Sequence, residues 1–242
     1  MKLQDKTVVI TGTTSGLGLA FSKALAARGA NVFGLARRES QLRETETELG
    51  DSYRGITCDV AREEDVRRAF EKIAEEAQGV DVLVNNAGLG KYGRVDALTA
   101  DDWDVQMAVN LRGVFLCTRA AIPLMQEQNR RTGFGGHIVN VASVAGLIGN
   151  PGMAAYNASK FGLRGFSEAL MKEVRYDGIK VTCLYPGSIQ TDFFQTADTS
   201  IAPNPMTAED VVSTLVHVLE TPENYLVSEV MMRPLRPQGR SA

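Results

Sequence analysis

Cysteine and histidine are scarce in this sequence of 242 residues. The three cysteines, Cys58, Cys117 and Cys183, lie far apart in apolar surroundings, and the two histidines are His137 and His217. Cysteines in this pattern are typical of buried free thiols, and so few His and Cys residues do not make a zinc site. A histidine-based catalytic triad would have to use one of only two residues. We therefore expect chemistry that uses neither a metal nor histidine.

An excess of positive charge and a long apolar run are also missing. The chain has 26 Lys and Arg against 29 Asp and Glu, a net charge of −3, and the charges are interspersed. This balance argues against nucleic acid or an anionic membrane as the main partner. No stretch approaches the ~18 uninterrupted apolar residues of a membrane span, and the start of the chain turns polar too soon for a signal peptide. We expect a cytoplasmic protein.

What the sequence does contain is a regular alternation of apolar strand-like runs and helix-like segments. Strands are predicted at 7–11, 31–36, 53–58, 80–84, 137–141, 180–184 and 228–232, and helices at 17–28, 39–49, 62–77, 100–129, 154–176 and 208–220. Strands that are apolar on both faces, with helices between them, indicate an α/β protein with a doubly wound parallel sheet of about seven strands and helices on both faces. Because no linker or repeat divides the chain, residues 1–242 are expected to form a single domain.

One long segment interrupts this alternation. Residues 186–206 contain three prolines, several Ser and Thr residues and the apolar pair Phe193 and Phe194. Long irregular loops inside compact domains are usually functional. We expect this segment to be a substrate loop over a site.

A glycine-rich turn, TGTTSGLG at residues 11–18, joins the first strand to the first helix. Gly12 permits a tight turn, Gly16 permits close approach of a ligand, and Gly18 permits close packing of the helix on the strand. The helix N-terminus offers free N–H groups to a pyrophosphate. A sharp turn without a ligand would use the same glycines, but the context favours nucleotide binding. The candidate contacts are Gly12, Thr14, Ser15, Gly16, Leu17 and Gly18.

The end of the second strand carries two arginines, Arg37 and Arg38. Two cations at the start of a helix oppose the helix dipole and call for a compensating anion. The 2′-phosphate of NADP is such an anion, and guanidinium groups match its shape. The alternative is a solvated pair neutralised by Glu39 and Glu44. The pattern favours NADP(H) over NAD(H).

Further candidate contacts follow the next two strands. Asp59, next to Val60, would accept a hydrogen bond from an adenine amino group or cap the following helix, and both roles stay open. After the fourth strand, small and amide residues stand where a nucleotide crosses the carboxyl ends of parallel strands, although they also suit a turn. These are Asn86, Ala87 and Gly88.

A serine, a tyrosine and a lysine form the candidate catalytic group. Tyr156 and Lys160 are four residues apart on a predicted helix and so share one face, and Ser143 ends the preceding strand. Tyrosine is a poor acid or base at neutral pH unless a nearby cation favours its phenolate. Lys160 can supply that cation, while Ser143 can bind the substrate oxygen and Tyr156 can exchange a proton with it.

These motifs, taken in order, resemble the short-chain dehydrogenase/reductase family. The resemblance runs from residue 11 to about 232 and rests on TGTTSGLG, on NNAG at 85–88, on Asn110 and Ser143, on YNASK at 156–160, and on Pro186 and Gly187 followed by Thr191. It implies a Rossmann-type fold and hydride transfer between a nicotinamide cofactor and a carbonyl or alcohol. The arginine pair matches the NADP-preferring branch, with its sepiapterin-reductase-like and 3-oxoacyl-reductase-like members.

The resemblance also implies roles for single residues. Tyr156 would be the acid and base, and Lys160 would lower its pKa and bind the nicotinamide ribose. Ser143 would position the substrate oxygen, and Asn110 would hold a water in a proton relay, although an asparagine that only caps or kinks a helix is the alternative. By the same analogy the nicotinamide would be contacted by Pro186, Gly187, Ile189 and Thr191.

The same resemblance implies a homotetramer or homodimer. The C-terminal stretch 227–234 lacks the glycine-rich ending of acyl-carrier-protein reductases, which weakens a fatty-acid assignment, although Arg130, Arg131 and Arg175 could still receive an acidic carrier. We therefore predict an NADP-dependent oxidoreductase acting on a small carbonyl or alcohol substrate of unspecified identity. A catalytically silent NADP-binding sensor or interaction subunit is the alternative. Lyase or epimerase chemistry on a nucleotide sugar usually needs a larger substrate domain.

Overall fold

The computed structural model describes residues 1–77, 79–190 and 203–238. In this part of the chain, seven strands form one sheet with the order β3-β2-β1-β4-β5-β6-β7, and every neighbouring pair is parallel. The strands are β1 (Thr7–Thr11), β2 (Asn31–Ala36), β3 (Tyr53–Thr57), β4 (Val82–Asn85), β5 (Gly136–Val141), β6 (Ile179–Pro186) and β7 (Glu229–Met232). The predicted doubly wound sheet is confirmed.

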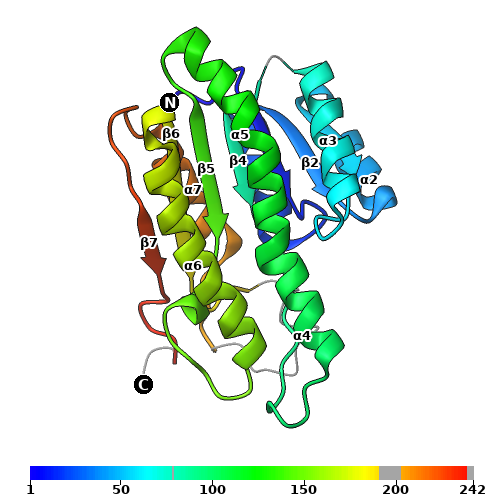
Figure 1. The fold of residues 1–242 in the computed structure, drawn as a ribbon, viewed down its shortest axis with the longest axis vertical. Coiled ribbons are helices and arrows are strands. Elements are labelled where there is room, and N and C mark those ends of the chain that lie inside the picture. Colours follow the sequence, from blue (N-terminus) through cyan, green and yellow to red (C-terminus); the bar gives the residue numbers. More distant parts are fainter. Residues whose placement is uncertain (78, 191–202, 239–242) are drawn as a thin grey trace.

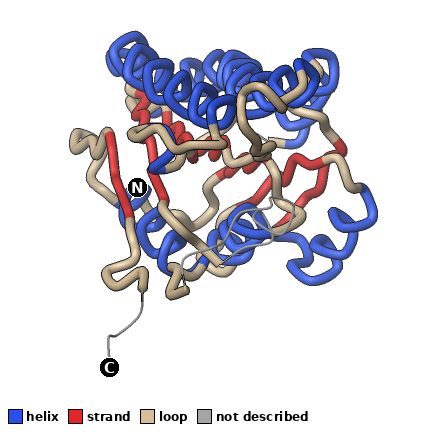
Figure 2. Tube along the Cα trace, turned by 90° about the horizontal axis from the view of Figure 1, so that it is seen from below, coloured by secondary structure: helices blue, strands red, loops and turns tan. Residues whose placement is uncertain are grey.

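Helices cover both faces of this sheet (Figure 1; Figure 2). One layer holds α1 (Gly16–Ala26), α2 (Glu39–Leu49) and α7 (Ala208–Glu220), and the other holds α3 (Glu63–Glu76), α4 (Ala100–Met107), α5 (Gly113–Thr132) and α6 (Ala154–Val174). Short helical turns occupy Gly50–Ser52, Val144–Gly146 and Arg175–Asp177, and a π-helical turn, Ala108–Arg112, joins α4 to α5. The resulting three layers are helix, sheet and helix.

Each face of the sheet has its own apolar core, and β1 shows why the strands are apolar on both faces. Val8 and Ile10 belong to the core under α1 and α7, whereas Val9 between them belongs to the core under α3 and α5. Successive side chains of a strand point to opposite faces, so a strand covered on both sides must be apolar at every position. Full burial of a side chain such as Phe21 of α1 is worth roughly 1.5–3 kcal/mol.

The helical run Ala100–Thr132 is long and apolar enough to cross a membrane by length and composition alone. However, 44% of its most apolar window is buried inside the protein, and α5 contacts α3, β4 and β5. Packing against the sheet therefore accounts for the apolar residues of its buried face. The predicted helix at 100–129 corresponds to α4, the π-helical turn and α5 together.

The order in which strands are added to the sheet reverses between β1 and β4. Folds of this kind bind ligands at that point. From β1 it moves outward through β2 and β3, and it then returns to β4 on the other side of β1. The Thr11 hydroxyl accepts hydrogen bonds from the backbone N–H groups of Asn86 (3.0 Å) and Ala87 (2.9 Å). These bonds fasten the segment after β4 to the end of β1, at the crevice outside the carboxyl ends of the strands.

The predicted substrate loop, 186–206, is described only at its two ends. Ile189 pairs with Met206, and the N–H of Gln190 donates to the Met206 carbonyl at 2.8 Å. The ends of the loop therefore lie side by side. Residues 191–202, which include Phe193 and Phe194, are outside the described part of the chain.

Candidate active site

The glycine turn has the geometry that its sequence predicts. Gly12 and Gly16 have φ angles of +74° and +52°, a backbone region that favours glycine. A Cβ on Gly18 would lie 2.0 Å from the Gly12 carbonyl oxygen, so only glycine lets α1 pack this closely on the turn. Helix α1 starts after Ser15 with no side-chain cap and no acidic residue in its first turn. Its first N–H groups are therefore available to an anion.

Arg38 is turned toward this glycine turn. It is the N-cap of α2, and its Nη2 donates to the Thr14 hydroxyl at 2.7 Å and to the Ser15 hydroxyl at 3.3 Å. Its Nε donates to the same Thr14 oxygen at 3.2 Å. Both Arg37 and Arg38 line the same cleft as the glycine turn. The structure therefore puts two cations beside the predicted pyrophosphate site.

The alternative for this arginine pair, a solvated pair neutralised by Glu39 and Glu44, has no ion pair to support it among the described residues. Glu39 pairs instead with Arg43 one turn along α2. Among the described residues, neither Arg37 nor Arg38 forms an ion pair with Glu39 or Glu44. The positive charge of the pair is left facing the cleft.

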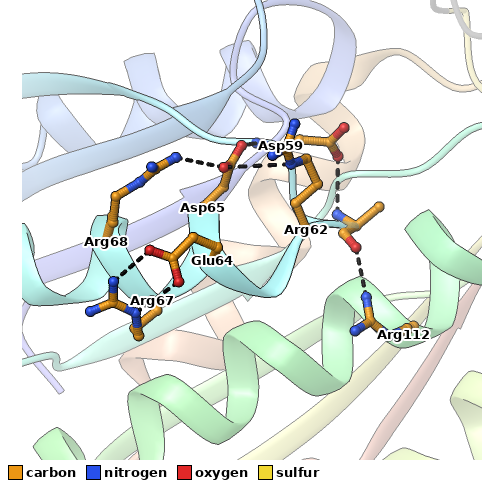
Figure 3. Close-up of polar contacts among 8 residues, drawn as sticks. Asp59, Arg62, Glu64, Asp65, Arg67, Arg68 and Arg112 are labelled. Atoms are coloured by element: carbon orange, nitrogen blue, oxygen red, sulfur yellow. Dashed lines mark hydrogen bonds and ion pairs between the residues drawn. The ribbon is translucent and has the colours of Figure 1, made fainter.

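Asp59 closes a turn rather than capping the next helix. Its Oδ1 accepts from the Ala61 N–H at 3.0 Å, while its own N–H donates to Asp65 (Figure 3). The N-cap of α3 is Arg62, which has no side-chain capping bond. Arg112, from the π-helical turn, donates to the Ala61 carbonyl at 2.6 Å and so holds the turn from the other side. Of the two roles left open for Asp59, helix capping is wrong, and Asp59 and Val60 both line the cleft.

The candidate catalytic residues come together at the other end of the cleft. Ser143 lies just beyond β5 and forms a side-chain hydrogen bond with Tyr156 of α6. The Lys160 ammonium donates to the Val141 carbonyl at 2.9 Å and lies 5.7 Å from the centroid of the Tyr156 ring. Tyr156 and Lys160 are both buried.

Burial dominates the ionisation of this pair. It raises the pKa of Tyr156 to about 12, and the hydrogen bond with Ser143 opposes this shift. Burial also lowers the pKa of Lys160 to about 8. Without a further positive charge nearby, Tyr156 is thus a neutral phenol near pH 7, and the expectation that Lys160 brings its pKa below the ordinary value does not hold for the protein alone. A neutral phenol is the form that can donate a proton.

Asn110 lies in the π-helical turn, completely buried. Its Oδ1 accepts from the Leu89 N–H at 2.9 Å, and its Nδ2 donates to the Leu89 carbonyl (2.9 Å) and to the Ser159 hydroxyl (3.1 Å). It therefore ties the segment after β4 to α6. Because both amide hydrogens are used, a water would have to bond an oxygen of this residue.

Most of the predicted site residues line a single cleft of about 470 Å³. Gly18 and Asn110 do not line this cleft, although Asn110 is bonded to Leu89, which does. Thr191 is outside the described residues. The predicted residues that line the cleft are Gly12, Thr14, Ser15, Gly16, Leu17, Arg37, Arg38, Asp59, Val60, Asn86, Ala87, Gly88, Ser143, Tyr156, Lys160, Pro186, Gly187 and Ile189.

Sequence reasoning missed several apolar wall residues. Most of them lie at or just beyond the carboxyl end of a strand, and one lies directly before Asn110. Their closeness in sequence to predicted site residues is the signal that could have identified them. They are Leu35, Ala36, Cys58, Leu89, Val109, Val141 and Ala142.

Comparison with known proteins gives the family. Residues 6–201 match the family described as short chain dehydrogenase. The chain is 36% identical over 234 residues to the 3-oxoacyl-[acyl-carrier-protein] reductase of Bos taurus, covering 94% of this chain and 96% of that one. It is 35% identical over 192 residues to the enzyme of that name from Vibrio cholerae, covering 79% and 77% of the two chains.

Solved structures agree. The closed form of a serine dehydrogenase complexed with NADP⁺ matches with a TM-score of 0.86 and 28% identity over 95% of each chain. A 3-ketoacyl-(acyl-carrier-protein) reductase from Brucella melitensis complexed with NADH matches with a TM-score of 0.86 and 29% identity over 95% of this chain and 97% of that one. The fold is Rossmann-like, and this chain belongs to the short-chain dehydrogenase family of oxidoreductases.

Proposed function

We propose that this chain is an NADP(H)-dependent oxidoreductase that transfers a hydride between nicotinamide and a carbonyl or secondary alcohol, with Tyr156 as acid and base. The cleft carries the proposal, because it runs from Arg37 and Arg38 to Ser143, Tyr156 and Lys160. One elongated ligand can therefore reach the arginine pair at one end and the reacting groups at the other.

The residues around the glycine turn fit a dinucleotide. The uncapped start of α1 provides N–H donors and a partial positive charge for the pyrophosphate. Gly12, Gly16 and Gly88 line the cleft without adding side chains to it. We propose that the adenine end lies near Asp59 and that Pro186, Gly187, Ile189 and Thr191 hold the nicotinamide end.

The preference for NADP(H) rests on the arginine pair. Guanidinium groups form charge-assisted, forked hydrogen bonds with a phosphate, and the 2′-phosphate is what distinguishes NADP from NAD. The relatives of known structure include complexes with NADP⁺ and with NADH. The preference for NADP(H) over NAD(H) therefore depends on Arg37 and Arg38 of this chain.

The protein residues would divide the chemistry among them. When bound, the nicotinamide ring supplies or accepts the hydride. The Ser143 hydroxyl would hold the reacting oxygen, and neutral Tyr156 would donate its proton to that oxygen. The charge on Lys160 would favour the phenolate left behind. An oxygen of Asn110 would hold the water that returns a proton.

The test is reduction of a carbonyl panel with NADPH, followed at the absorbance band of the reduced nicotinamide. The panel includes simple ketones, aldehydes and 3-oxo esters, and serine is tried with NADP⁺. Tyr156→Phe should lower kcat by roughly 10²–10⁴-fold and leave the Kd of NADPH unchanged. Tyr176→Phe, at an exposed tyrosine, is the matched control. NADPH binding without turnover of any substrate would favour the silent sensor instead.

We propose that the whole chain acts as one domain and that the 186–206 loop selects the substrate. The supporting observation is that the loop leaves and re-enters the fold beside the nicotinamide end of the cleft, where Ile189 pairs with Met206. Exchange of this loop for that of a relative should change the preferred substrate and leave the Kd of NADPH unchanged.

We also propose a homotetramer or homodimer in the cytoplasm. Trp103, Phe115 and Phe161 are 42–43% exposed on α4, α5 and α6, in the helix layer at the front of Figure 1. Exposed large apolar side chains mark protein interfaces. The free, buried cysteines fit a reducing compartment. Light scattering should give two or four times the chain mass of 26.2 kDa, and the Phe115→Glu/Phe161→Glu double variant should give the monomer mass.

A further inference from the structure

Tyr92 carries a hydroxyl that no contact among the described residues explains. It lies in the segment between β4 and α4, and its oxygen is buried with no hydrogen-bond partner in the described part of the protein. Burying a hydroxyl without a partner costs free energy, so such groups are rare in folded proteins. A buried donor without a partner beside an active site is a candidate for contact with the substrate.

The ring of Tyr92 packs directly on the candidate catalytic residue. Its centroid lies 5.6 Å from that of Tyr156, and the two planes meet at 77°, an edge-to-face contact. Tyr156 itself lines the cleft. Tyr92 is therefore at the substrate end of the site rather than at the adenine end.

Three hydrogen bonds from backbone N–H groups fix the segment that carries Tyr92. The Leu89 N–H donates to Asn110, the Lys91 N–H donates to the buried Gln106 side chain at 3.0 Å, and the Gly93 N–H donates to the Gly152 carbonyl at 2.8 Å. These bonds restrain the backbone on both sides of Tyr92. A segment with a restrained backbone loses less conformational entropy when it binds a ligand.

Gly90 makes room for the hydroxyl. A Cβ at this position would lie 2.4 Å from the Tyr92 oxygen, so a larger residue would push the phenol away. Burial also raises the pKa of Tyr92 above its ordinary value, which keeps the phenol neutral and able to donate. The segment thus presents one neutral donor at a defined place.

We propose that the Tyr92 hydroxyl donates a hydrogen bond to a second oxygen of the substrate, next to the carbonyl that Tyr156 and Ser143 would hold. This inference rests on the proposed function and adds a substrate class: carbonyl compounds with another acceptor oxygen near the reacting group, such as 3-oxo esters and thioesters. Tyr92 then selects these over simple ketones, which would leave its hydroxyl unsatisfied.

The experiment compares ethyl acetoacetate with 2-octanone, a methyl ketone of similar size without the second oxygen. Wild-type enzyme should prefer the 3-oxo ester. Tyr92→Phe keeps the ring and removes only the hydroxyl, so it should lower kcat/KM for the 3-oxo ester roughly 10- to 100-fold and change that for 2-octanone less than about 3-fold. The Kd of NADPH should not rise, and the melting temperature should not fall.

Gly90→Ala is the second variant, because it leaves Tyr92 in place but displaces its hydroxyl. It should weaken the preference for the 3-oxo ester in the same direction. Equal losses on both substrates, no loss on the 3-oxo ester, a weaker affinity for NADPH or a lower melting temperature in Tyr92→Phe would each overturn the inference. Failure of the wild-type enzyme to reduce either compound or any other carbonyl contradicts the proposed function itself, and the inference falls with it.

Discussion

Arg38 and Thr14 join the end of β2 to the glycine turn, with the Arg38 guanidinium donating to the Thr14 hydroxyl from Nη2 at 2.7 Å and from Nε at 3.2 Å. The two residues are 24 positions apart in the chain. This contact holds a cation beside the start of α1, where an anion is also favoured by the free N–H groups.

The first prediction concerns cofactor choice at this contact. Arg38→Ala should raise the Kd of NADPH by roughly 10- to 100-fold, because it removes charge-assisted hydrogen bonds to the 2′-phosphate. The Kd of NADH should change less than about 3-fold. Fluorescence titration measures both constants, and Arg43→Ala, on the same helix but paired with Glu39, is the control. Equal losses for the two cofactors would contradict the proposed phosphate contact.

The second prediction concerns the pH dependence that Lys160 imposes on stability. Burial lowers its pKa to about 8 from its ordinary value of 10.5. Between these values the unfolded chain binds a proton that the folded protein does not, so the free energy of unfolding rises with pH. From pH 8 to 9.5 the gain due to this group is roughly 1–2 kcal/mol.

Denaturant titrations at pH 8 and 9.5 measure this change in the free energy of unfolding. Lys160→Met should lose this gain, whereas Lys172→Met, which removes an exposed lysine of α6, should keep it. An equal change in the free energy of unfolding between the two pH values in wild type and Lys160→Met would contradict the lowered pKa of Lys160.

The third prediction concerns acid stability and His137. Thr182 donates its hydroxyl hydrogen to the Val227 carbonyl at 2.6 Å, so the His137 Nε2 at 2.8 Å must be the donor to Thr182. Burial, with Lys180 and the N-terminal amine adding to it, lowers the pKa of His137 to about 3. The neutral form is therefore built into the fold.

Stability should consequently fall as the pH drops from 6.5 toward about 3, because only the unfolded chain then binds the proton. Between pH 7 and pH 5 the loss due to His137 is about 2 kcal/mol. His137→Gln can still donate to Thr182 and should not show this part of the loss, while His217→Gln, at an exposed position on α7, should. Urea unfolding at the two pH values measures the difference, and identical losses in wild type and His137→Gln would refute it.

The fourth prediction concerns the glycine turn. Gly18→Ala places a methyl group 2.0 Å from the Gly12 carbonyl oxygen, so α1 must shift. We expect a loss of about 1–3 kcal/mol in the free energy of unfolding and weaker NADPH binding. Gly165→Ala in α6 meets nothing within 4 Å and should be neutral or stabilise by up to about 1 kcal/mol. Calorimetry and NADPH titration give both values, and an unperturbed Gly18→Ala would argue against the close packing.

Much of this architecture could be predicted from the chain itself. The strand at 31–36 and the helices at 39–49 and 208–220 begin and end where apolar periodicity predicts. Strand β6 is longer than predicted, Ile179–Pro186 rather than 180–184, because pairing with β5 and β7 extends it at both ends. Its extra residues carry no periodic signal of their own.

The site divides in the same way. Motif spacing identified Ser143, Tyr156 and Lys160, but the raised pKa of Tyr156 depends on how completely the surrounding elements bury it. The residues around Asp59 did not show whether its side chain caps α3 or closes a turn. That depends on where the chain bends before α3. Tyr92 gave no signal at all, since its significance lies in the ring that it packs against.

The sequence by itself determined the parallel sheet, its helical layers and the order of the cofactor and catalytic motifs, because apolar alternation and motif spacing are properties of neighbouring residues. Only the tertiary structure decided that Arg38 meets Thr14, that Asn110 bridges Leu89 and Ser159, and that Tyr92 packs on Tyr156. These partners are 21 or more positions apart, so their contacts exist only once the sheet has brought the carboxyl ends of its strands to one edge.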